Sequence, residues 1–501
     1  MLLQQQRRGG GVVSLMQNNK APNKTKSLAA NSIYNVIYRL LNTVFPLIAT
    51  VYSSHILLSS GVGKVTSAQN IVSYFILIAS LGIPTYGIKA IAVARQNKER
   101  LSQTFWELFI INLISSVACS LCFIVMIENA PFIKGEQALY LVAGLNLFAN
   151  VLNVDWFYQG LEEYKYITLR SIVVKAVSYG LMFIFVRDRS DYIVYALLSS
   201  TALVGNYFFN AIRVWKYITP HFTGLHFSKH LKPIMFLLAS TVAVEVYTLA
   251  DTTMITFMCN DSAVGMYDVA SKVIRVVRGV CTAACAVFLP RLSMYYSQNQ
   301  LSEFKDLIGK GFKMLLIFTI PAAAGIILIA NPAIVLLFGE SFEGSIFPAQ
   351  ILAVSIISVA LSGFFGNQVL VTVGKEKTVM LSTMLGAAAN VCLNSILIPC
   401  MGISGAAIAS VITELGVAAF QMFNLRNSYL PKTEGKFWLS VGISIAIMSG
   451  FVLLMKALIA NSIIRVAVAI VAGVIGYTIG LLITRNEVVF EIINKIQQHK
   501  K

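Results

Sequence analysis

Charged side chains are scarce in this sequence. Asp, Glu, Lys and Arg make up 12% of its 501 residues, whereas 57% are hydrophobic. Soluble domains carry about twice that share of charge, and a water-soluble chain of this length needs far more polar surface to cover its core. The low charge therefore excludes a soluble globular protein, and we expect the apolar excess to face lipid.

Residues suited to metal or redox chemistry are also few and scattered. The seven cysteines lie mostly within apolar runs, so no disulfide framework is indicated, and the five histidines lack zinc-ligand spacing. The sequence contains neither a Walker phosphate-binding loop nor a readable pairing of nucleophile and base. We therefore expect no catalytic residues, no metal, no cofactor and no cleavable signal peptide.

The sequence does contain many long apolar runs. Crossing a bilayer as a helix takes about 20 such residues, and these runs lack the two-residue alternation of membrane β-strands. We therefore predict an all-α polytopic membrane protein with about 14 transmembrane helices. The approximate spans are 30–57, 65–92, 104–127, 136–156, 166–186, 192–214, 232–258, 264–290, 311–336, 347–373, 378–399, 404–424, 437–458 and 463–483.

The placement of basic residues predicts the topology. If the N-terminus is inside, 27 of the 39 Lys and Arg residues fall in inner segments and six fall in outer loops. Because positively charged loops stay in the cytoplasm, we expect a multi-pass protein of the cytoplasmic (inner) membrane with both termini cytoplasmic. This bias, with attraction to anionic membrane lipid, accounts for the net charge of +17, so we expect no nucleic-acid partner.

The first twelve spans look like two related halves. Val62-Gly63 opens the second span and Val264-Gly265 opens the eighth, and in both an Ala follows five residues after the Gly. The matches are short, so chance similarity is the alternative. Paired halves in one orientation are common in transporters, with the substrate site between them. The expected organisation is a tail at 1–29, an N-lobe at 30–214 (helices 1–6), a loop at 215–231, a C-lobe at 232–424 (helices 7–12), helices 13–14 at 437–483 and a tail at 484–501.

The eighth span carries the most informative charges. A charge at mid-membrane costs about 2.5–3.5 kcal/mol on insertion scales, so such groups usually face a cavity or a partner. Lys272, Arg275 and Arg278 are spaced by three and lie within a sector of roughly 120°. This stripe favours an anion-binding wall in a water-filled cavity. The alternative is salt bridges to Glu245 and Asp251 of the seventh span.

Other intramembrane charges are weaker candidates. Asp268 lies one helical turn before Lys272 and is placed to pair with it. Arg39, shortly before Pro46 in the first span, is a candidate for facing the cavity, whereas Lys175 has no assigned role. The candidates for ion coupling or salt bridges are Glu107, Glu245, Asp251 and Asp268.

Four motifs in order along the chain resemble those of one transporter family. DWFYQGLEEYKYIT (155–168) contains a W-x-x-Q-G-x-E pattern, although its aromatic run taken alone predicts an anchor at the membrane interface. AVGMYDVASKV (263–273), FLPRLSMYY (288–296) and LIPCMGISGAAIASVITE (397–414) follow. Together they resemble Wzx-type oligosaccharide flippases of the multidrug/oligosaccharidyl-lipid/polysaccharide exporter superfamily. The motif residues are Trp156, Gln159, Gly160, Glu162, Gly265, Tyr267, Pro290, Gly402 and Gly405.

The resemblance implies two lobes around a cavity that opens alternately to either side. It implies a transporter rather than an enzyme, which flips undecaprenyl-pyrophosphate-linked oligosaccharide repeat units for surface polysaccharide biosynthesis. It also implies a polysaccharide polymerase and a chain-length regulator as partners. On this reading Arg39, Lys272, Arg275 and Arg278 bind the pyrophosphate and glycan. The alternatives are a multidrug exporter coupled to Na⁺ or H⁺, a lipid II flippase of the same superfamily, and a membrane-embedded glycan polymerase or ligase, against which the short outer loops argue.

Overall fold

The computed structural model describes residues 28–285, 288–426, 429–431 and 433–491, and every regular element in this part of the chain is helical. The α-helices are α1 (Leu28–Ser80), α2 (Ile83–Ala94), α3 (Lys98–Asn129), α4 (Gln137–Phe148), α5 (Asp155–Gly160), α6 (Tyr164–Phe185), α7 (Tyr192–Val214), α8 (Ser228–Met258), α9 (Asp261–Cys285), α10 (Leu289–Ser297), α11 (Leu301–Phe338), α12 (Ile346–Ser362), α13 (Glu376–Met401), α14 (Ile403–Phe423), α15 (Gly435–Leu458) and α16 (Ser462–Ile483). Short 3₁₀ segments are η1 (Pro131–Ile133), η2 (Asn150–Leu152), η3 (Arg189–Asp191) and η5 (Glu340–Ser345), and η6 (Gly363–Leu370) is a π-helix.

The all-α fold class is confirmed, and each predicted span coincides with one helix or with consecutive helical segments. Within the described residues, ten helical stretches are long and apolar enough to cross a membrane, and the first of them, Leu41–Ala94, covers two predicted spans. The fourth span is shorter than predicted, because it breaks into α4, η2 and α5. The seventh and eighth spans, α8 and α9, are not among the ten; each of these two spans carries more charged residues than any other predicted span.

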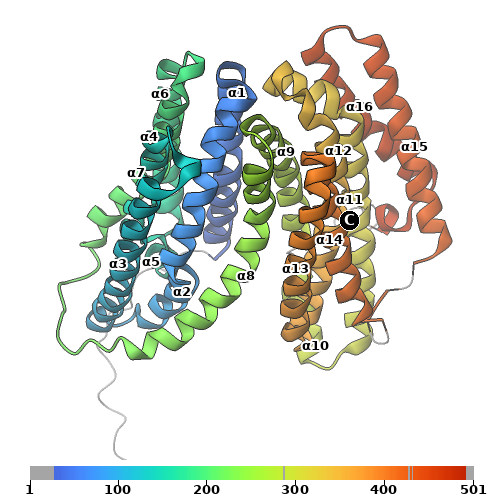
Figure 1. Cartoon of the computed structure of the whole chain (residues 1–501). Helices are drawn as coiled ribbons and strands as arrows, with labels where there is room; N and C mark the ends of the chain where they lie inside the picture. Colours follow the sequence, from blue (N-terminus) through green and yellow to red (C-terminus); the bar gives the residue numbers. More distant parts are fainter. Residues whose placement is uncertain (1–27, 286–287, 427–428, 432, 492–501) are drawn as a thin grey trace, which may run out of the picture.

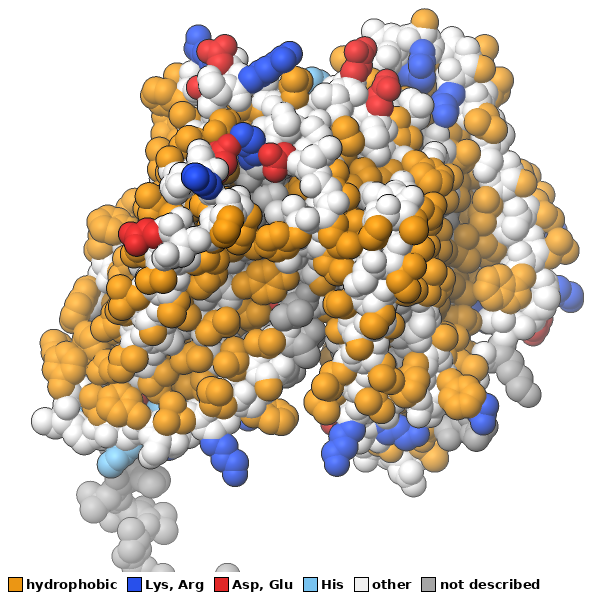
Figure 2. All heavy atoms as spheres, in the orientation of Figure 1, with side chains coloured by type: hydrophobic (Ala, Val, Ile, Leu, Met, Phe, Trp, Pro, Cys, Tyr) orange, Lys and Arg blue, Asp and Glu red, His pale blue; other side chains and the backbone are white. Residues whose placement is uncertain are grey.

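The helices form two bundles with α8 and α9 between them (Figure 1). Helices α1 to α7 make one bundle, the N-lobe, and α10 to α14 make the other, for which we keep the name C-lobe, although the predicted C-lobe (232–424) also included α8 and α9. Helices α15 and α16 pack on each other and on α11 at its outer side. Helix α1 consists of two helical parts that meet at a kink at Leu58, where φ is 58°. We call the end that holds this kink and the α8–α9 turn the upper end, and the end that holds α2 and α10 the lower end. Figure 2 shows hydrophobic side chains over the middle of this face, and charged side chains gathered toward the two ends.

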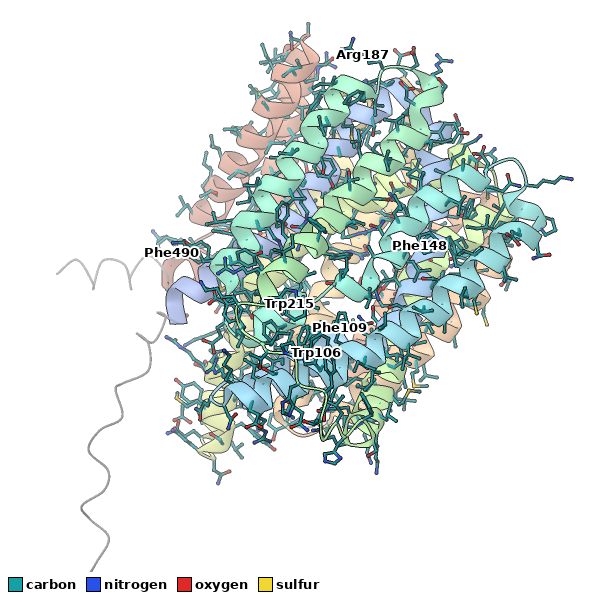
Figure 3. All side chains as sticks on the ribbon, turned by 90° about the vertical axis from the view of Figure 1, so that its left-hand side faces the viewer. Trp106, Phe109, Phe148, Arg187, Trp215 and Phe490 are labelled. Atoms are coloured by element: carbon teal, nitrogen blue, oxygen red, sulfur yellow. The ribbon has the colours of Figure 1, made fainter. Side chains whose placement is uncertain are left out.

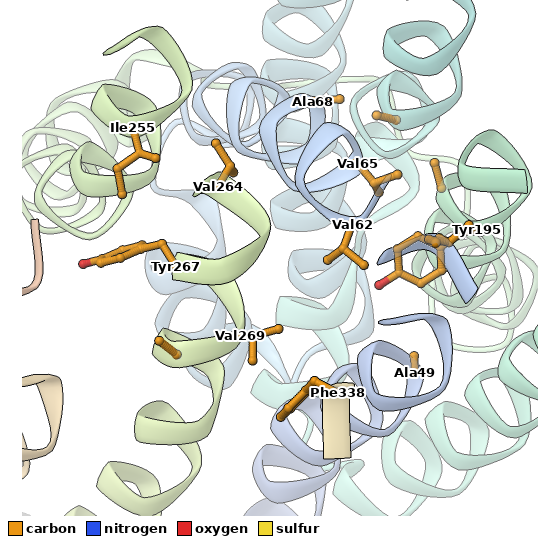
Figure 4. Packing of buried hydrophobic residues seen from close by; sticks show 14 of the residues in the cluster. Ala49, Val62, Val65, Ala68, Tyr195, Ile255, Val264, Tyr267, Val269 and Phe338 are labelled. Carbon is orange, nitrogen blue, oxygen red and sulfur yellow. The ribbon is translucent and has the colours of Figure 1, made fainter. Parts of the chain in front are cut away.

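Among the described residues, the hydrophobic core that the two lobes share lies toward the upper end. One cluster joins Val62 of α1 to Val264 and Val269 of α9, and Phe338 of α11 packs into it (Figure 4). Toward the lower end each lobe has its own cluster, around Phe105 in the N-lobe and around Phe304 in the C-lobe. The lobes are therefore fastened at the upper end and packed separately at the lower end.

Two glycines allow α9 to pack closely against α1 of the N-lobe. A Cβ atom on Gly63 would lie 1.7 Å from the carbonyl oxygen of Asp261, and one on Gly265 would lie 2.1 Å from that of Ser59. Beside them the Ser59 hydroxyl donates to the Ser262 hydroxyl at 3.2 Å. These glycines are the matched positions of the two predicted halves, so each half presents the same small residue to the other.

The same backbone turn ends the fourth and tenth spans. In the N-lobe the amide of Glu163 donates to the carbonyl of Tyr158 at 2.9 Å, and in the C-lobe Lys375 donates to Leu370 at 2.8 Å. The residue before each donor has a positive φ, 59° at Glu162 and 76° at Gly374. In space Glu162 therefore corresponds to Gly374, so the turn is repeated although glycine stands at this position in one half only.

Candidate transport cavities

A cavity of about 500 Å³ lies in the N-lobe, inside the membrane-spanning region. Its walls come from α1, α4, α6 and α7, and Lys272 of α9 closes one side. Side-chain amides, hydroxyls and tyrosine rings line most of it, together with two lysines. The principal lining residues are Tyr38, Asn42, Thr50, Gln69, Asn146, Asn153, Asp155, Lys175, Tyr179, Tyr195, Asn206, Tyr207 and Lys272.

Both lysines of the N-lobe cavity are held by polar partners. Lys272 forms the predicted ion pair with Asp268 at 2.6 Å and also donates to the Thr50 hydroxyl of α1 at 2.9 Å. Lys175 of α6 is only 3% exposed and donates to the side-chain oxygen of Asn42. No role was predicted for Lys175, because only the packing of α6 against α1 brings it to the same cavity as Lys272.

The other two cations of the stripe line a separate pocket in the C-lobe, of about 120 Å³. Arg275 is exposed at this pocket, and Arg278 donates to the Ser355 hydroxyl of α12 and lies close to Glu414. The predicted stripe therefore exists as a continuous row on α9, but its members face cavities of different lobes. Glu414 comes from α14, so Arg278 connects three helices around this pocket.

Asp251 also lines the C-lobe pocket, but with neutral partners. Its carboxylate accepts hydrogen bonds from the Tyr267 hydroxyl at 2.5 Å and the Asn394 amide at 2.7 Å, and from the Ser410 hydroxyl. Glu245 is exposed on α8, and in the described part of the chain neither carboxylate forms an ion pair with Lys272 or Arg275. For these two cations, the predicted salt bridges to α8 are not formed.

The interfacial-anchor interpretation of the aromatic run is wrong. Trp156, Phe157 and Tyr158 are each at most 2% exposed, because α5 packs into the N-lobe core beside α2. The preceding Asp155 accepts from the Tyr38 hydroxyl at 2.8 Å and pairs with Arg170 at 3.1 Å. The run therefore positions a carboxylate at the cavity wall, and the charge directly before the aromatic residues was the signal that could have indicated this.

The remaining residues of this first motif form a structural joint. A Cβ atom on Gly160 would lie 2.8 Å from side-chain carbons of Ile91, so α5 can approach α2 closely only with glycine there. Glu162 pairs with Arg95 at 2.6 Å across the same joint, and Gln159 is half-buried. These contacts hold the lower ends of α2 and α5 together.

Glu107 lies outside both cavities, at the lower end of α3. Its fully buried carboxylate lies 2.8 Å from Lys229 and from His230, and accepts from the backbone amide of His226 at 2.7 Å. Nitrogen Nδ1 of the same His230 lies 2.9 Å from the Tyr86 hydroxyl. This candidate for ion coupling therefore ties the inter-lobe loop and the start of α8 to the N-lobe.

The other sequence candidates are spread over the molecule. Tyr267 donates to Asp251, and Gly265 lies at the α1–α9 contact described above. Pro290 is exposed in α10, and Gly402 has a positive φ of 57° in the tight connection between α13 and α14, next to Gly405. The side chain of Arg39 lies outside the residues whose side chains the structure describes.

Sequence comparisons identify relatives of this chain. A sequence model described as "Polysaccharide biosynthesis protein" matches residues 28–296, more than half of the chain, and one described as "Lipid II flippase MurJ" matches residues 196–473. A "Putative O-antigen transporter" of Escherichia coli strain K12 is 23% identical over 81% of this chain and 98% of its own length. A "Probable low-salt glycan biosynthesis flippase Agl15" of Haloferax volcanii is 24% identical over 48% of this chain and 51% of its own length.

Solved structures share the fold. The chain is similar to a structure of "Lipid II flippase MurJ, inward closed conformation", with a TM-score of 0.72, 15% identity, and coverage of 92% of this chain and 100% of the other. A multidrug resistance MATE family transporter in an inward-facing conformation gives a TM-score of 0.59, 16% identity, and coverage of 80% and 98%. The chain therefore belongs to the polysaccharide biosynthesis protein family, as a Wzx-type flippase of the multidrug/oligosaccharidyl-lipid/polysaccharide exporter superfamily.

Proposed function

We propose that this protein flips undecaprenyl-pyrophosphate-linked oligosaccharide repeat units from the inner to the outer leaflet of the cytoplasmic membrane. The observation that carries the proposal is the row of cations on α9, which runs from Lys272 in the N-lobe cavity to Arg275 and Arg278 in the C-lobe pocket. A pyrophosphate crossing the hydrocarbon region needs such charges, and the planar guanidinium group suits phosphate oxygens. Arg39 belongs to this proposed substrate site by its position in the sequence.

The lining of the N-lobe cavity suits a glycan. Sugar hydroxyls both donate and accept hydrogen bonds, and side-chain amides such as Asn42, Gln69 and Asn146 offer both functions. The tyrosine rings of the same cavity provide flat apolar faces with a polar edge. We propose that the sugars occupy this cavity while the pyrophosphate contacts the α9 row, with Lys175 at the cavity wall.

Transport by alternating access follows from the way the lobes are joined. The lower end carries most of the basic loops, so by the positive-inside rule it is proposed to be the cytoplasmic side, with both termini there. The shared core at the upper end then closes the outer side, and the separate cores at the lower end allow the lobes to part. Rocking of the lobes about this contact would expose the row to each side in turn.

Ion coupling, if transport uses it, is proposed to involve Asp251. Asp268 is paired with Lys272, and Glu107 is enclosed in the cluster at the end of α3. Among the described residues Asp251 instead has only neutral donors, so its carboxylate is free to exchange them for a cation; Glu245, which is exposed, is the second candidate.

A polysaccharide polymerase and a chain-length regulator are proposed partners, since a flipped repeat unit must be consumed on the outer side.

Flipping in proteoliposomes tests the proposal. An undecaprenyl-pyrophosphate oligosaccharide with a labelled terminal sugar is incorporated with the protein, and movement is scored by protection from an external glycosidase. We expect protein-dependent movement, and we expect Arg275→Ala to reduce it at least tenfold, about 1.4 kcal/mol or more of lost stabilisation. Arg189→Ala is the matched control, because Arg189 is an exposed arginine in η3 that lines neither cavity.

The same assay separates the competing functions. Unchanged flipping by Arg275→Ala, with membrane insertion intact, would remove the α9 row from the substrate path. Lipid II is the second substrate to try, because the MurJ sequence model matches 196–473 and a MurJ structure shares the fold. Movement of lipid II but of no other lipid-linked glycan would establish that function instead, and movement of organic cations alone would point to a multidrug exporter.

A further inference from the structure

A second charged pocket lies on the membrane-facing side of the N-lobe, away from the transport cavities. It has a volume of about 470 Å³ and lies between the lower ends of α6 and α7. This is the side of the molecule that Figure 3 turns toward the viewer, where the labelled Trp215 follows the end of α7. The proposed transport mechanism gives this pocket no role.

The polar half of the pocket is formed by a lysine and two arginines around one tyrosine ring. The guanidinium carbon of Arg213 lies 3.8 Å from the centre of the Tyr166 ring, and that of Arg170 lies 5.6 Å from it. Arg170 is occupied by Asp155, Asn206 and Asn210 on its other side.

Arg213, by contrast, has donors to spare. Its only described hydrogen bond is a long one of 3.3 Å to the Tyr217 hydroxyl, and its buried Nε has no partner among the described residues. Lys165, exposed at the rim, has no ion pair in the described part of the chain, and Glu163 is the only acidic residue in the lining. The pocket therefore keeps a surplus of positive charge and unused N–H donors.

In another basic pocket, elsewhere on the lower end, two of the four cations are paired with carboxylates. There Lys310 pairs with Asp306 at 2.9 Å and with Glu491 at 3.3 Å, and Lys313 pairs with Glu487 at 2.5 Å. Its other two cations, Lys305 and Arg426, lie over the rings of Tyr429 and Phe423. This pocket therefore contains more ion pairs than the one between α6 and α7, where Arg170 is the cation with a described pair.

The other half of the pocket is apolar and faces the bilayer. Val173 is 61% exposed and Phe209 is 50% exposed, and Leu169 lies in the same lining. The ring centres of Trp215 and Trp106 lie 5.8 Å apart near this end. Aromatic residues are expected in this position, at the level of the lipid headgroups. The pocket therefore places cationic donors at headgroup depth and an apolar wall beside the acyl chains.

We propose that this pocket binds an anionic phospholipid of the inner leaflet, with its phosphate at Lys165 and Arg213 and its acyl chains along Leu169, Val173 and Phe209. The combination suits a phosphate on a lipid, because the guanidinium group can donate two parallel hydrogen bonds and a juxtamembrane cation attracts anionic lipid. The site does not depend on what the central cavity transports. Its assignment to the inner leaflet does rest on the proposed orientation.

The Arg170 side chain would lie between the bound lipid and the transport cavity. Arg170 lines the pocket, and its ion pair with Asp155 lies at the wall of the N-lobe cavity. An occupant of the pocket therefore supports the Arg170–Asp155 wall from the lipid side.

Quenching by brominated lipids tests the site in the full-length protein. The reporter is Phe209→Trp, which places an indole in the pocket, and Phe185→Trp, an exposed position at the upper end of α6, is the matched reporter outside the pocket. Both are made with Trp106, Trp215 and Trp438 replaced by Phe, and the buried Trp156 is kept. The proteins are reconstituted in phosphatidylcholine vesicles that contain brominated phosphatidylglycerol or brominated phosphatidylcholine at the same low mole fraction.

We expect brominated phosphatidylglycerol to be enriched at the Phe209→Trp reporter about fivefold over brominated phosphatidylcholine. Glu163 in the lining offsets one of the two cations Lys165 and Arg213, and the remaining positive charge contributes about 1 kcal/mol. The Phe185→Trp reporter should show no such preference. Lys165→Gln and Arg213→Gln should each abolish the preference, whereas Lys216→Gln, a lysine of the same end outside the pocket, should keep it. Lys165 is exposed, so its variant should fold even if Arg213→Gln does not.

Two outcomes would count against the site. Equal quenching of the pocket reporter by the two lipids, or a preference that survives Lys165→Gln, overturns the proposal. Displacement of the brominated phosphatidylglycerol by stoichiometric undecaprenyl phosphate overturns the choice of a phospholipid in favour of the polyprenyl lipid.

Discussion

At the residue scale, the spacing of Lys272, Arg275 and Arg278 predicted that they share one face of a helix, but not which cavity each of them lines. Three cations at intervals of three residues had to share one sector of a helix, and they do. The spacing could not indicate that α9 runs between two lobes, so that Lys272 turns to one cavity and Arg275 to another. The pairing of Lys272 with Asp268 was predictable, because both partners lie on one helix. Its second contact, with Thr50, comes from a distant helix and was not.

Exchanging the charges of Asp268 and Lys272 separates a structural pair from a substrate contact. In the double variant Asp268→Lys with Lys272→Asp the ion pair can re-form in reverse, so we expect insertion and thermal stability close to those of the parent. We expect the double variant to flip substrate at least tenfold more slowly than the parent protein, because the ammonium group no longer lies beside Thr50 at the cavity wall. Glycosidase protection in proteoliposomes and the melting temperature in detergent measure the two effects. Restored flipping would make the pair purely structural.

The helices themselves were largely predictable, and their irregularities were not. Apolar runs indicate where a helix lies, because its backbone must be satisfied within the bilayer. The left-handed Leu58, with φ 58°, and the break between α4 and α5 depend on packing against other helices. The match between Gly63 and Gly265 predicted two equivalent positions, but only the folded chain brings them into mutual contact.

The α1–α9 contact gives a prediction about these helices. Gly265→Ala adds a methyl group that would lie 2.1 Å from the Ser59 carbonyl oxygen, so the helices must move apart. Overpacking of this kind costs about 1–3 kcal/mol, and we expect a lower melting temperature together with impaired flipping. Gly279→Ala is the control on the same helix, since no described atom outside its own stretch of helix lies within 4 Å of the added carbon, and it should be neutral or slightly stabilising. Equal behaviour of the two variants would contradict the close contact.

At the scale of the whole molecule, the fastening of the lobes at one end is a property that no single segment encodes. The basic loops predicted which end faces the cytoplasm, and the matched halves predicted two bundles. Which end is closed depends on the long-range core that joins Val62 to Val264 and Phe338. If transport requires this contact to open, holding it closed should stop transport without disturbing either lobe.

A disulfide between α1 and α9 provides that lock. The hydroxyl oxygens of Ser59 and Ser262 lie 3.2 Å apart at the upper end, which brings the two side chains within the range a disulfide spans. In a background without the seven native cysteines, we expect Ser59→Cys with Ser262→Cys to cross-link readily under mild oxidation. Because the bond would hold the outer side closed, flipping should fall to the level of protein-free vesicles and return on reduction with dithiothreitol. Each single variant, treated in the same way, should remain active. Full flipping by protein whose cross-link is complete would show that the lobes do not part at this contact during transport.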